Sequence, residues 1–260
     1  MQVINIDLDH DKPYEIYHIG DIHSGIIPSD EEKATKAFNI LRNKSRALFC
    51  GMGDYCEYRE PGHPYYDAEQ ADKTIDEQLD WVFHQFSKVR SKTLGILIGN
   101  HEHKLMTQTT INTIKRYCQD NEVNYFGDMA HVSFNFPSGT RFTMIVSHGS
   151  GAATTLGSKI NKITRFARGQ QVDAVVWGHV HELMTWPLAS LNIGPRQYKP
   201  NFTSRYTMCG FSGSFLRTYM LNSTTYGQQR HYDPTPVGYL VSIIDPGKRM
   251  VQMRPEIMDV

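Results

Sequence analysis

The first half of the chain alternates short apolar segments with amphipathic helical patterns, and this alternation limits the fold more than any other feature of the sequence. Strands are predicted at 14–20, 46–51 and 93–99, and helices near 29–41, 68–90 and 107–118. After residue 131 the pattern changes to strands at 131–136, 141–147, 173–178, 183–189, 204–211 and 238–244, with one helix at 156–168. The sequence therefore predicts an α/β (α+β) fold with a mixed two-sheet core and helices outside.

Length and composition are those of an ordinary globular protein. The 260 residues fit one large domain, and 40% hydrophobic with 21% charged residues argues against a disordered chain. The longest apolar stretches, such as 94–98, are too short to span a bilayer, and the acidic segment 1–11 does not resemble a signal peptide. The four cysteines have no metal or redox spacing. We therefore expect a single cytoplasmic domain over 1–260 with no membrane partner.

The charges divide unevenly along the chain, although their formal sum is zero. Residues 1–128 contain 21 acidic and 14 basic residues, whereas residues 129–232 contain 2 acidic and 10 basic residues. A basic segment of this kind favours a polyanionic or phosphate-bearing partner. The alternative is that the fold brings the two halves together, so that their charges neutralise each other.

Residues suited to metal binding follow the predicted strands. They comprise two Asp, one Asn and four His: Asp21, His23, Asp54, Asn100, His148, His179 and His181. Alternate residues of an extended segment share a face, so Asp21 and His23 are expected to converge, as are His179 and His181. Strand ends at one rim of a sheet bring together side chains that are distant in the sequence.

This donor set predicts two metal ions rather than one. Carboxylate, amide oxygen and imidazole suit divalent ions such as Mn²⁺, Fe²⁺, Zn²⁺ or Mg²⁺, and the lack of a thiolate in the set argues against a structural zinc site. Seven protein ligands are too many for one catalytic ion that must keep open positions. They suit two ions with one carboxylate bridging them.

Each motif alone is more often a surface pair or a turn, but the complete ordered set is specific. The motifs are Gly-Asp-Ile-His-Ser-Gly at 20–25, Gly-Asp at 53–54, Gly-Asn-His-Glu at 99–102, Ser-His-Gly at 147–149 and Gly-His-Val-His at 178–181. Together they resemble the calcineurin-like metallophosphoesterase superfamily. The resemblance implies a four-layer sandwich of two mixed β-sheets flanked by α-helices, with the β-rich segment 183–260 completing the fold and the substrate face.

The resemblance also divides the seven residues between two ions. It implies that the first ion takes Asp21, His23 and His181, that the second takes Asn100, His148 and His179, and that Asp54 bridges both. Mn²⁺ is the favoured metal, with Fe²⁺, Zn²⁺, Ni²⁺ or Mg²⁺ as alternatives. A metal-bridging hydroxide would be the nucleophile, since a metal lowers the pKa of a bound water from about 15.7 to about 7.

His101 and Glu57 are the predicted catalytic residues. His101 matches the family histidine that protonates the leaving oxygen or holds the phosphate, and with Asn100 it is expected to contact the substrate. A positioned acid contributes about 10²- to 10⁴-fold. Glu57 lies three residues after Asp54, where the Ser/Thr phosphatase branch has an acid that orients this histidine. The next residue is Tyr58, where that branch has arginine, which weakens a protein phosphatase assignment; a solvated loop position for Glu57 is the alternative.

Two features bear on the substrate. Lys159, Lys162 and Arg165 recur every third residue on the helix after His148, and they are expected either to bind a phosphate backbone or to form a solvated face. Bases alternate with aromatic residues between 196 and 232, which is typical of nucleotide binding, although rings at strand spacing are more often core.

Three functions are consistent with these features. The first, which the basic segment favours, is a phosphodiesterase acting on a nucleotide or nucleic acid, including a nuclease. The second is a phosphomonoesterase or protein phosphatase, because the acidic loop 57–72 would exclude long polyanions. The third is a non-catalytic metal-binding scaffold, which the intact ligand set and His101 disfavour. The sequence leaves the substrate and the oligomeric state open.

Overall fold

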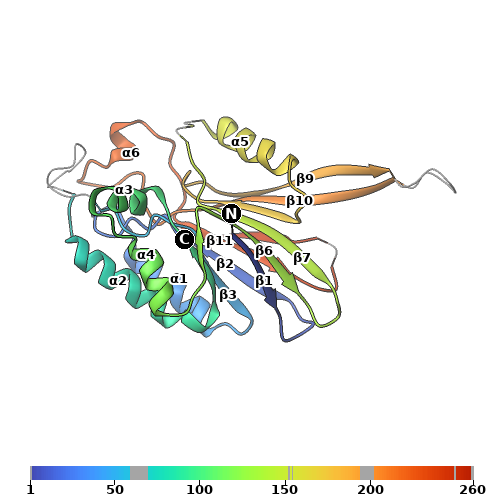
Figure 1. The fold of residues 1–260 in the computed structure, drawn as a ribbon. Helices are drawn as coiled ribbons and strands as arrows, with labels where there is room; N and C mark the ends of the chain where they lie inside the picture. The colour runs from blue at the N-terminus through green and yellow to red at the C-terminus, as the bar shows by residue number, and fades with distance from the viewer. Residues whose placement is uncertain are drawn as a thin grey trace.

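The chain folds into two mixed β-sheets that pack against each other, with helices on their outer faces (Figure 1). The structure is a computed structural model that describes residues 2–58, 70–151, 153, 155–193, 202–248 and 250–258. Within these residues each sheet has six strands. The predicted architecture of two mixed sheets flanked by helices is therefore confirmed.

The first sheet has the strand order β1-β6-β7-β8-β10-β9. Its strands are β1 (Gln2–Asp7), β6 (Met129–Asn135), β7 (Arg141–Ser147), β8 (Ala174–Trp177), β9 (Leu183–Ile193) and β10 (Phe202–Ser212). β7, β8 and β10 run parallel, whereas β6 pairs antiparallel with β7, and β9 pairs antiparallel with β10. The β9–β10 hairpin is longer than predicted and projects from the body of the molecule (Figure 1).

The second sheet has the strand order β12-β11-β2-β3-β4-β5. Its strands are β2 (Tyr14–Ile19), β3 (Ala47–Gly51), β4 (Thr93–Leu97), β5 (Tyr125–Gly127), β11 (Gly238–Ile244) and β12 (Gln252–Ile257). β2, β3, β4 and β5 are parallel, and helix α1 (Glu31–Asn43) connects β2 to β3. Helix α2 (Ile75–Lys88) and the 3₁₀ turn Arg90–Lys92 precede β4. This is the strand–helix alternation that the sequence predicted.

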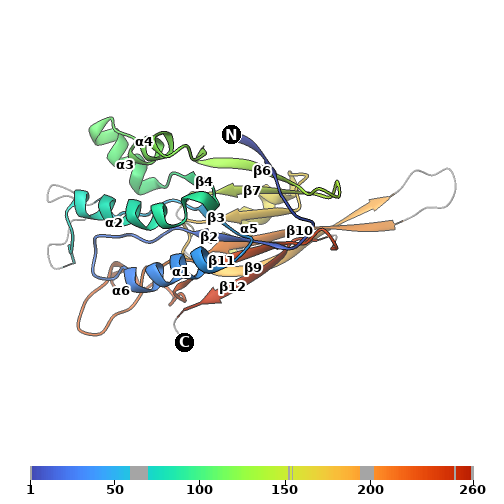
Figure 2. The same ribbon diagram turned by 90° about the horizontal axis from the view of Figure 1, so that it is seen from below.

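Apolar side chains fill three layers between these elements. Helices α1 and α2 lie side by side on the outer face of the second sheet (Figure 2), where the rings of Phe38 and Phe86 pack 5.4 and 5.5 Å from that of Phe49. Helix α5 (Leu156–Arg168) covers the first sheet through Ile163, which packs in one cluster with Val175. Residues such as Ile16, Met144 and Leu240 fill the space between the sheets.

Helix α3 (Asn100–Thr109) begins directly after β4, earlier than the helix predicted at 107–118. That prediction was wrong, because two helices occupy this region: Thr110 adopts a left-handed backbone with φ of 63°, and α4 (Thr113–Asp120) follows. The Glu102 carboxylate accepts a hydrogen bond from the Gly99 N–H and so starts α3 at the strand end. Asn100 and His101 therefore lie in the first turn of a helix, not in a loop.

The remaining short helix, α6 (Tyr226–Gln229), lies between β10 and β11 in the chain. Cys50, Cys56, Cys118 and Cys209 are buried and free. Across the described residues, no helix combines the length and apolar character that crossing a membrane requires.

Candidate metal centre

The seven predicted ligands meet at one end of the two sheets. They follow the carboxyl ends of β2, β3 and β4 in the second sheet and of β7 and β8 in the first. Because the carboxyl ends of parallel strands lie at one edge, residues far apart in the sequence become neighbours. His23 and His181, for example, are 158 positions apart and lie in contact.

The first group of donors consists of Asp21, His23 and His181, whose ligand atoms lie within 4.8 Å of one another. Nε2 of His23 is 3.1 Å from Nε2 of His181, which is 3.4 Å from Oδ1 of Asp21. Asp21 is 0% exposed and His23 only 4%, so both donors are withdrawn from bulk water. Two imidazole nitrogens that face each other can share only one proton, whereas a cation between them satisfies both.

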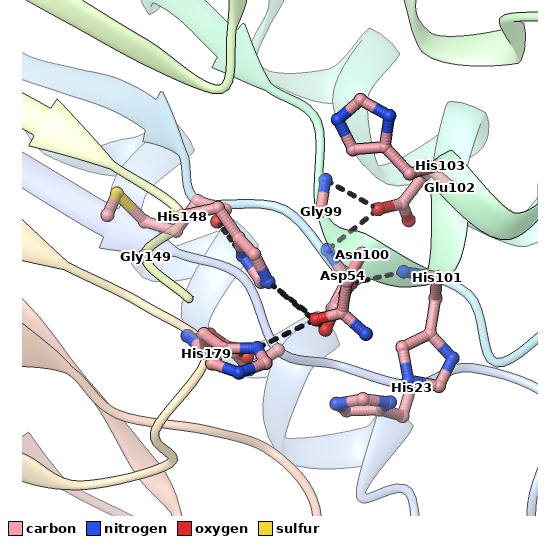
Figure 3. A network of polar contacts seen from close by, with 12 residues as sticks. His23, Asp54, Gly99, Asn100, His101, Glu102, His103, His148, Gly149 and His179 are labelled. Atoms are coloured by element: carbon pink, nitrogen blue, oxygen red, sulfur yellow. Dashed lines mark hydrogen bonds and ion pairs between the residues drawn. The ribbon is translucent and has the colours of Figure 1, made fainter. Parts of the chain in front are cut away.

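The second group consists of Asp54, His148 and His179, joined by Asn100 (Figure 3). Oδ1 of Asn100 lies 3.1 Å from Nε2 of His148 and 2.7 Å from Nδ1 of His179. Nε2 of His148 is also 3.2 Å from Oδ2 of Asp54. Carboxylate, amide and imidazole donors thus converge here as they do in the first group, and the donor types suit borderline or hard divalent ions.

A left-handed backbone, not an extended one, makes the paired residues converge. The φ angles are 47° at Asp21, 55° at His23, 50° at Asp54, 66° at His179 and 57° at His181. Such angles are uncommon for residues other than glycine and cost of order 1–3 kcal/mol each. The explanation from strand alternation was therefore wrong. The convergence that it predicted occurs for Asp21 and His23, whereas His181 joins their group and His179 joins the group of Asp54 and His148. Strain of this kind is typical of functional sites that the surrounding fold holds in place.

Burial keeps two of the histidines in the form that binds metals. Burial lowers the pKa of His23, against the opposing effect of the Glu57 carboxylate. Burial also lowers the pKa of His179, and the nearby His148 lowers it further. A neutral imidazole has a lone pair for a cation, so these shifts favour metal binding over protonation.

Asp54 and His148 form a buried pair with opposite shifts. Burial alone would raise the pKa of Asp54, but the charges of His148 and His101 hold that pKa well below its usual range. Burial lowers the pKa of His148, yet the Asp54 carboxylate outweighs this effect and raises that pKa to about 10. A proton on His148 thus balances the buried carboxylate, and a divalent cation supplies the same compensation when it binds.

Hydrogen bonds on the far side of each ring fix which imidazole nitrogen faces the site. Nδ1 of His23 lies 2.8 Å from the Glu57 carboxylate, and Nδ1 of His148 lies 2.7 Å from the carbonyl oxygen of Met52. These acceptors place the proton on Nδ1 and leave Nε2 for a ligand. In His179 the roles are reversed, since Nε2 contacts the Gly151 carbonyl oxygen at 3.1 Å while Nδ1 faces Asn100.

Glu102 holds the second group together, a role that the sequence analysis did not assign. Its carboxylate is 2% exposed and accepts hydrogen bonds from the backbone N–H groups of Asp54, Tyr55 and Gly99 at 2.9, 2.8 and 2.8 Å (Figure 3). A Cβ at Gly99 would lie 2.2 Å from the Asp54 nitrogen, so only glycine permits this approach. The signal that could have found this role is a glutamate three residues after Gly99, which the structure shows to be the N-cap of α3.

Glu57 lies closer to His23 than to its predicted partner His101. Its Oε2 atom is 2.8 Å from Nδ1 of His23 and 3.7 Å from Nδ1 of His101. His101 instead contacts the Glu57 main-chain carbonyl oxygen at 2.8 Å, and its backbone N–H donates to Oδ1 of Asp54 at 2.9 Å. Burial lowers the pKa of His101, but Asp54 and Glu57 together raise it above its usual value. Glu57 is 2% exposed and is not a solvated loop acid.

A cavity of about 600 Å³ opens onto both donor groups. His23, Asp54, Asn100 and His101 line it, as does Lys159 of α5. The Lys159 ammonium is engaged by the Glu182 carboxylate at 2.8 Å.

The other two predicted substrate-binding bases lie elsewhere on α5. Lys162 and Arg165 are exposed and are not among the cavity-lining residues, and the Lys162 ammonium bonds the carbonyl of Ser150. Arg217 of the basic segment pairs with Asp30 of the acidic half. Arg205 pairs with Asp173, which lies in the basic segment itself. Part of the charge asymmetry is therefore neutralised within the fold.

Two groups of candidate metal ligands therefore lie at the shared end of two mixed sheets. The family model described as calcineurin-like phosphoesterase matches residues 14–183, which include all seven donors. The chain belongs to this family, which implies divalent metal ions and phosphate-ester substrates. No curated protein matches the sequence.

Several solved structures resemble the chain at low sequence identity. A predicted phosphoesterase from Streptococcus pneumoniae TIGR4 is 10% identical with a TM-score of 0.39, over 94% of this chain and 98% of that one. Vps29 complexed with Zn²⁺ from Entamoeba histolytica is 12% identical, with a TM-score of 0.38 over 94% and 98%. A metallophosphoesterase from Sphaerobacter thermophilus is 14% identical, with a TM-score of 0.43 over 94% and 89%.

Proposed function

We propose that the chain is a two-metal phosphodiesterase that acts on nucleotide esters, with Mn²⁺ as its favoured metal. The observation that carries this proposal is the convergence of two donor groups, one around His23 and one around His148, on a single cavity. In the proposal Asp21, His23 and His181 hold one ion and Asn100, His148 and His179 hold the other. Asp54 would hold both ions, because its carboxylate lies 3.2 Å from Nε2 of His148 and the charge of His23 also lowers its pKa.

The ions supply the electrophilic part of the chemistry. When bound, two divalent ions lower the pKa of a coordinated water to about 7 and stabilise negative charge on the entering and leaving oxygens. The residues of the chain then orient the ester and transfer a proton to the leaving group.

His101 is the proposed general acid. Its Nδ1 donates to the Glu57 carbonyl oxygen, so Nε2 is the nitrogen that can face a substrate in the cavity. A proton at Nε2 can pass to the leaving oxygen as the phosphorus–oxygen bond breaks. The backbone N–H of His101 also donates to Asp54, which fixes the acid relative to the proposed bridging ligand.

Glu57 is proposed to position His23, and Asn100 to serve both an ion and the phosphate. The carboxylate–imidazole contact is of the kind that orients a metal-binding histidine and raises its basicity. Lys159 is proposed to contact the phosphate from the cavity wall, in exchange for its ion pair with Glu182. Lys162 and Arg165 remain proposed contacts for a longer substrate only, since they lie outside the cavity.

We also propose that residues 1–260 act as one cytoplasmic domain. The support for one domain is that β1, before the matched region 14–183, and β10, β11 and β12, after it, belong to the same two sheets as the strands within that region.

The test compares the turnover of two chromogenic esters by protein that has been stripped of metal and reloaded with Mn²⁺. The proposal is supported if bis(4-nitrophenyl) phosphate is turned over faster than 4-nitrophenyl phosphate. The Asp54→Asn variant should then lose the turnover of the diester. His101→Ala should lower turnover by about 10²- to 10⁴-fold for an alkyl leaving group. The loss should be smaller for 4-nitrophenolate, which departs without a proton.

His103→Ala is the matched control, because His103 lies on the same helix, bonds Asp128 and is not a cavity-lining residue. It should keep full activity. Turnover of the monoester alone would mean that the protein is a phosphomonoesterase or protein phosphatase and not a phosphodiesterase. Metal binding without turnover of any ester would leave only the non-catalytic scaffold.

A further inference from the structure

The cavity continues beyond the two donor groups to a wall built from residues 216–235. Leu216, Thr218, Tyr226, Tyr232 and Asp233 line this far end. A volume of about 600 Å³ lies within the range of roughly 300–1,000 Å³ that holds small ligands. The organic substituent of a phosphate bound at the donor groups would lie in the same cavity as this wall.

Hydrogen bonds tie the beginning of the wall directly to the metal loop. The Ser214 hydroxyl and the Phe215 N–H donate to the carbonyl oxygen of Asp21 at 2.8 and 3.0 Å. The Arg217 guanidinium donates to the buried Asp30 carboxylate at 2.6 and 3.0 Å. The wall thus has a fixed position relative to Asp21, as a specificity element requires.

Two tyrosines give the wall its chemical character. Tyr226 and Tyr232 are 38% and 40% exposed, and their ring centroids lie 6.0 Å apart at 78°. The Tyr219 hydroxyl donates to the carbonyl oxygen of Tyr232 at 2.8 Å and holds that part of the loop. By contrast, Phe211 and Phe215 of the same aromatic-rich segment are fully buried. The segment therefore divides into core rings and rings that face the cavity.

The charges around these rings favour a neutral planar group over a cation. The Arg230 guanidinium lies 5.4 Å above the Tyr226 ring, and Arg217 also lines the cavity. These positive charges repel a cationic ligand, which would otherwise be attracted to the ring faces. Asp233 also lines the cavity, as do Thr218 and Thr235, whose hydroxyls bond each other at 3.0 Å. Flat faces with polar edges suit a nucleobase.

We propose that Tyr226, Tyr232 and Asp233 form a nucleobase subsite, which places a mononucleotide-sized ester between this wall and the metal centre. The proposal rests on the proposed function for the position of the phosphate. It assigns specificity to a segment, 216–235, that lies outside the motif-bearing region 20–181. The subsite binds through stacking and edge contacts and takes no part in bond cleavage.

The test measures binding rather than turnover. Calorimetry on the Mn²⁺-loaded protein compares phosphonate analogues of adenosine 5′-monophosphate and of ribose 5-phosphate, in which carbon replaces the ester oxygen so that neither is hydrolysed. Stacking of a base on an aromatic side chain should make the adenosine analogue bind about 5- to 100-fold more tightly. The Tyr226→Ala/Tyr232→Ala double variant should bring this affinity ratio close to one. Tyr206→Ala, at a tyrosine that is 43% exposed and outside the cavity lining, should keep it.

Each remaining outcome separates the subsite from the proposed function. Equal affinity of the wild-type protein for both analogues overturns the subsite, even if the protein hydrolyses diesters. A base-dependent affinity that the double variant loses supports the subsite, even if no ester is hydrolysed and the proposed function fails. Tighter binding of a phosphocholine phosphonate than of the adenosine analogue would overturn the nucleobase assignment in favour of a cationic substituent.

Discussion

The carboxylate of Glu57 lies 2.8 Å from Nδ1 of His23, within the buried side of the first donor group. Glu57 therefore lies beside His23 as well as beside His101, the residue that it was expected to orient. The sequence predicted an acid that orients His101, but the closer imidazole belongs to a proposed metal ligand. Replacing the carboxylate should therefore affect metal binding before it affects proton transfer.

Glu57→Gln is expected to weaken Mn²⁺ binding by about 10- to 100-fold, since outer contacts of metal-binding histidines contribute this much. Competition with a chromogenic chelator measures the affinity. Glu32→Gln, at an exposed acid of α1, is the control and should leave the affinity as in the wild-type protein. Unchanged affinity together with a shifted acidic limb of the pH–rate profile would return Glu57 to its originally predicted role beside His101.

Neutralising Glu102 should lower the free energy of unfolding more than neutralising any other single carboxylate in this region. Glu102→Gln replaces a charged acceptor of three backbone N–H groups with an amide, and hydrogen bonds to charged groups contribute about 1.5–3 kcal/mol each. We expect the free energy of unfolding of the metal-free protein to fall by at least about 2 kcal/mol, as measured by urea denaturation.

Glu77→Gln is a matched control for that variant, because Glu77 holds the equivalent third position of α2 and accepts from the Thr74 N–H at an exposed site. Its effect should be much smaller. Equal losses in the two variants would mean that Glu102 acts only as an ordinary helix cap and does not hold the Asp54 loop.

His18 should make the protein sensitive to mild acid. It is fully buried in β2, its Nε2 contacts the Ser242 hydroxyl at 2.8 Å, and burial lowers its pKa to about 3. The unfolded chain, with a histidine pKa of about 6.5, binds a proton that the folded chain does not. The stability that His18 contributes is therefore present above pH 6.5 and is lost progressively as the pH falls toward 3.

Between pH 7 and pH 5 this linkage should lower the free energy of unfolding by about 2 kcal/mol. His18→Gln removes the titration and should reduce the loss between these pH values, measured by urea denaturation in the presence of a chelator. His84→Gln, at an exposed position of α2, should leave the loss of stability between pH 7 and pH 5 unchanged. The same pH dependence in both variants would refute the assignment to His18.

The sequence alone predicted the architecture and named the seven candidate donors that the fold brings together, because both depend on local pattern. Hydrophobic periodicity located β7, α5 and β11 with the bounds that the structure has. Three strands escaped prediction, β1, β5 and β12, and each is an outermost strand of its sheet. β5 has only three residues. β1 and β12 are largely exposed, so their apolar pattern is weak. Their pairing depends on contacts with β6 and β11, which no local pattern encodes.

The geometry of the site could not be read from the sequence. Motif spacing brought Asp21 and His23 together for the wrong reason, since a left-handed backbone held by tertiary contacts replaces the expected extended one. The partner of the Glu57 carboxylate depends on how the loops after β2 and β3 pack, and the sequence offset with Asp54 does not determine it. Likewise, only the folded chain separates Tyr226 from the core ring of Phe215.

The central claim is that the two donor groups hold two ions with Asp54 between them. Anomalous scattering from crystals grown with Mn²⁺ tests it most directly. We predict two peaks about 3.5–4 Å apart, one beside His23 and His181 and the other beside His148 and His179, with the Asp54 carboxylate contacting both. A single peak, or peaks that leave Asp54 without a metal, would contradict the two-metal account.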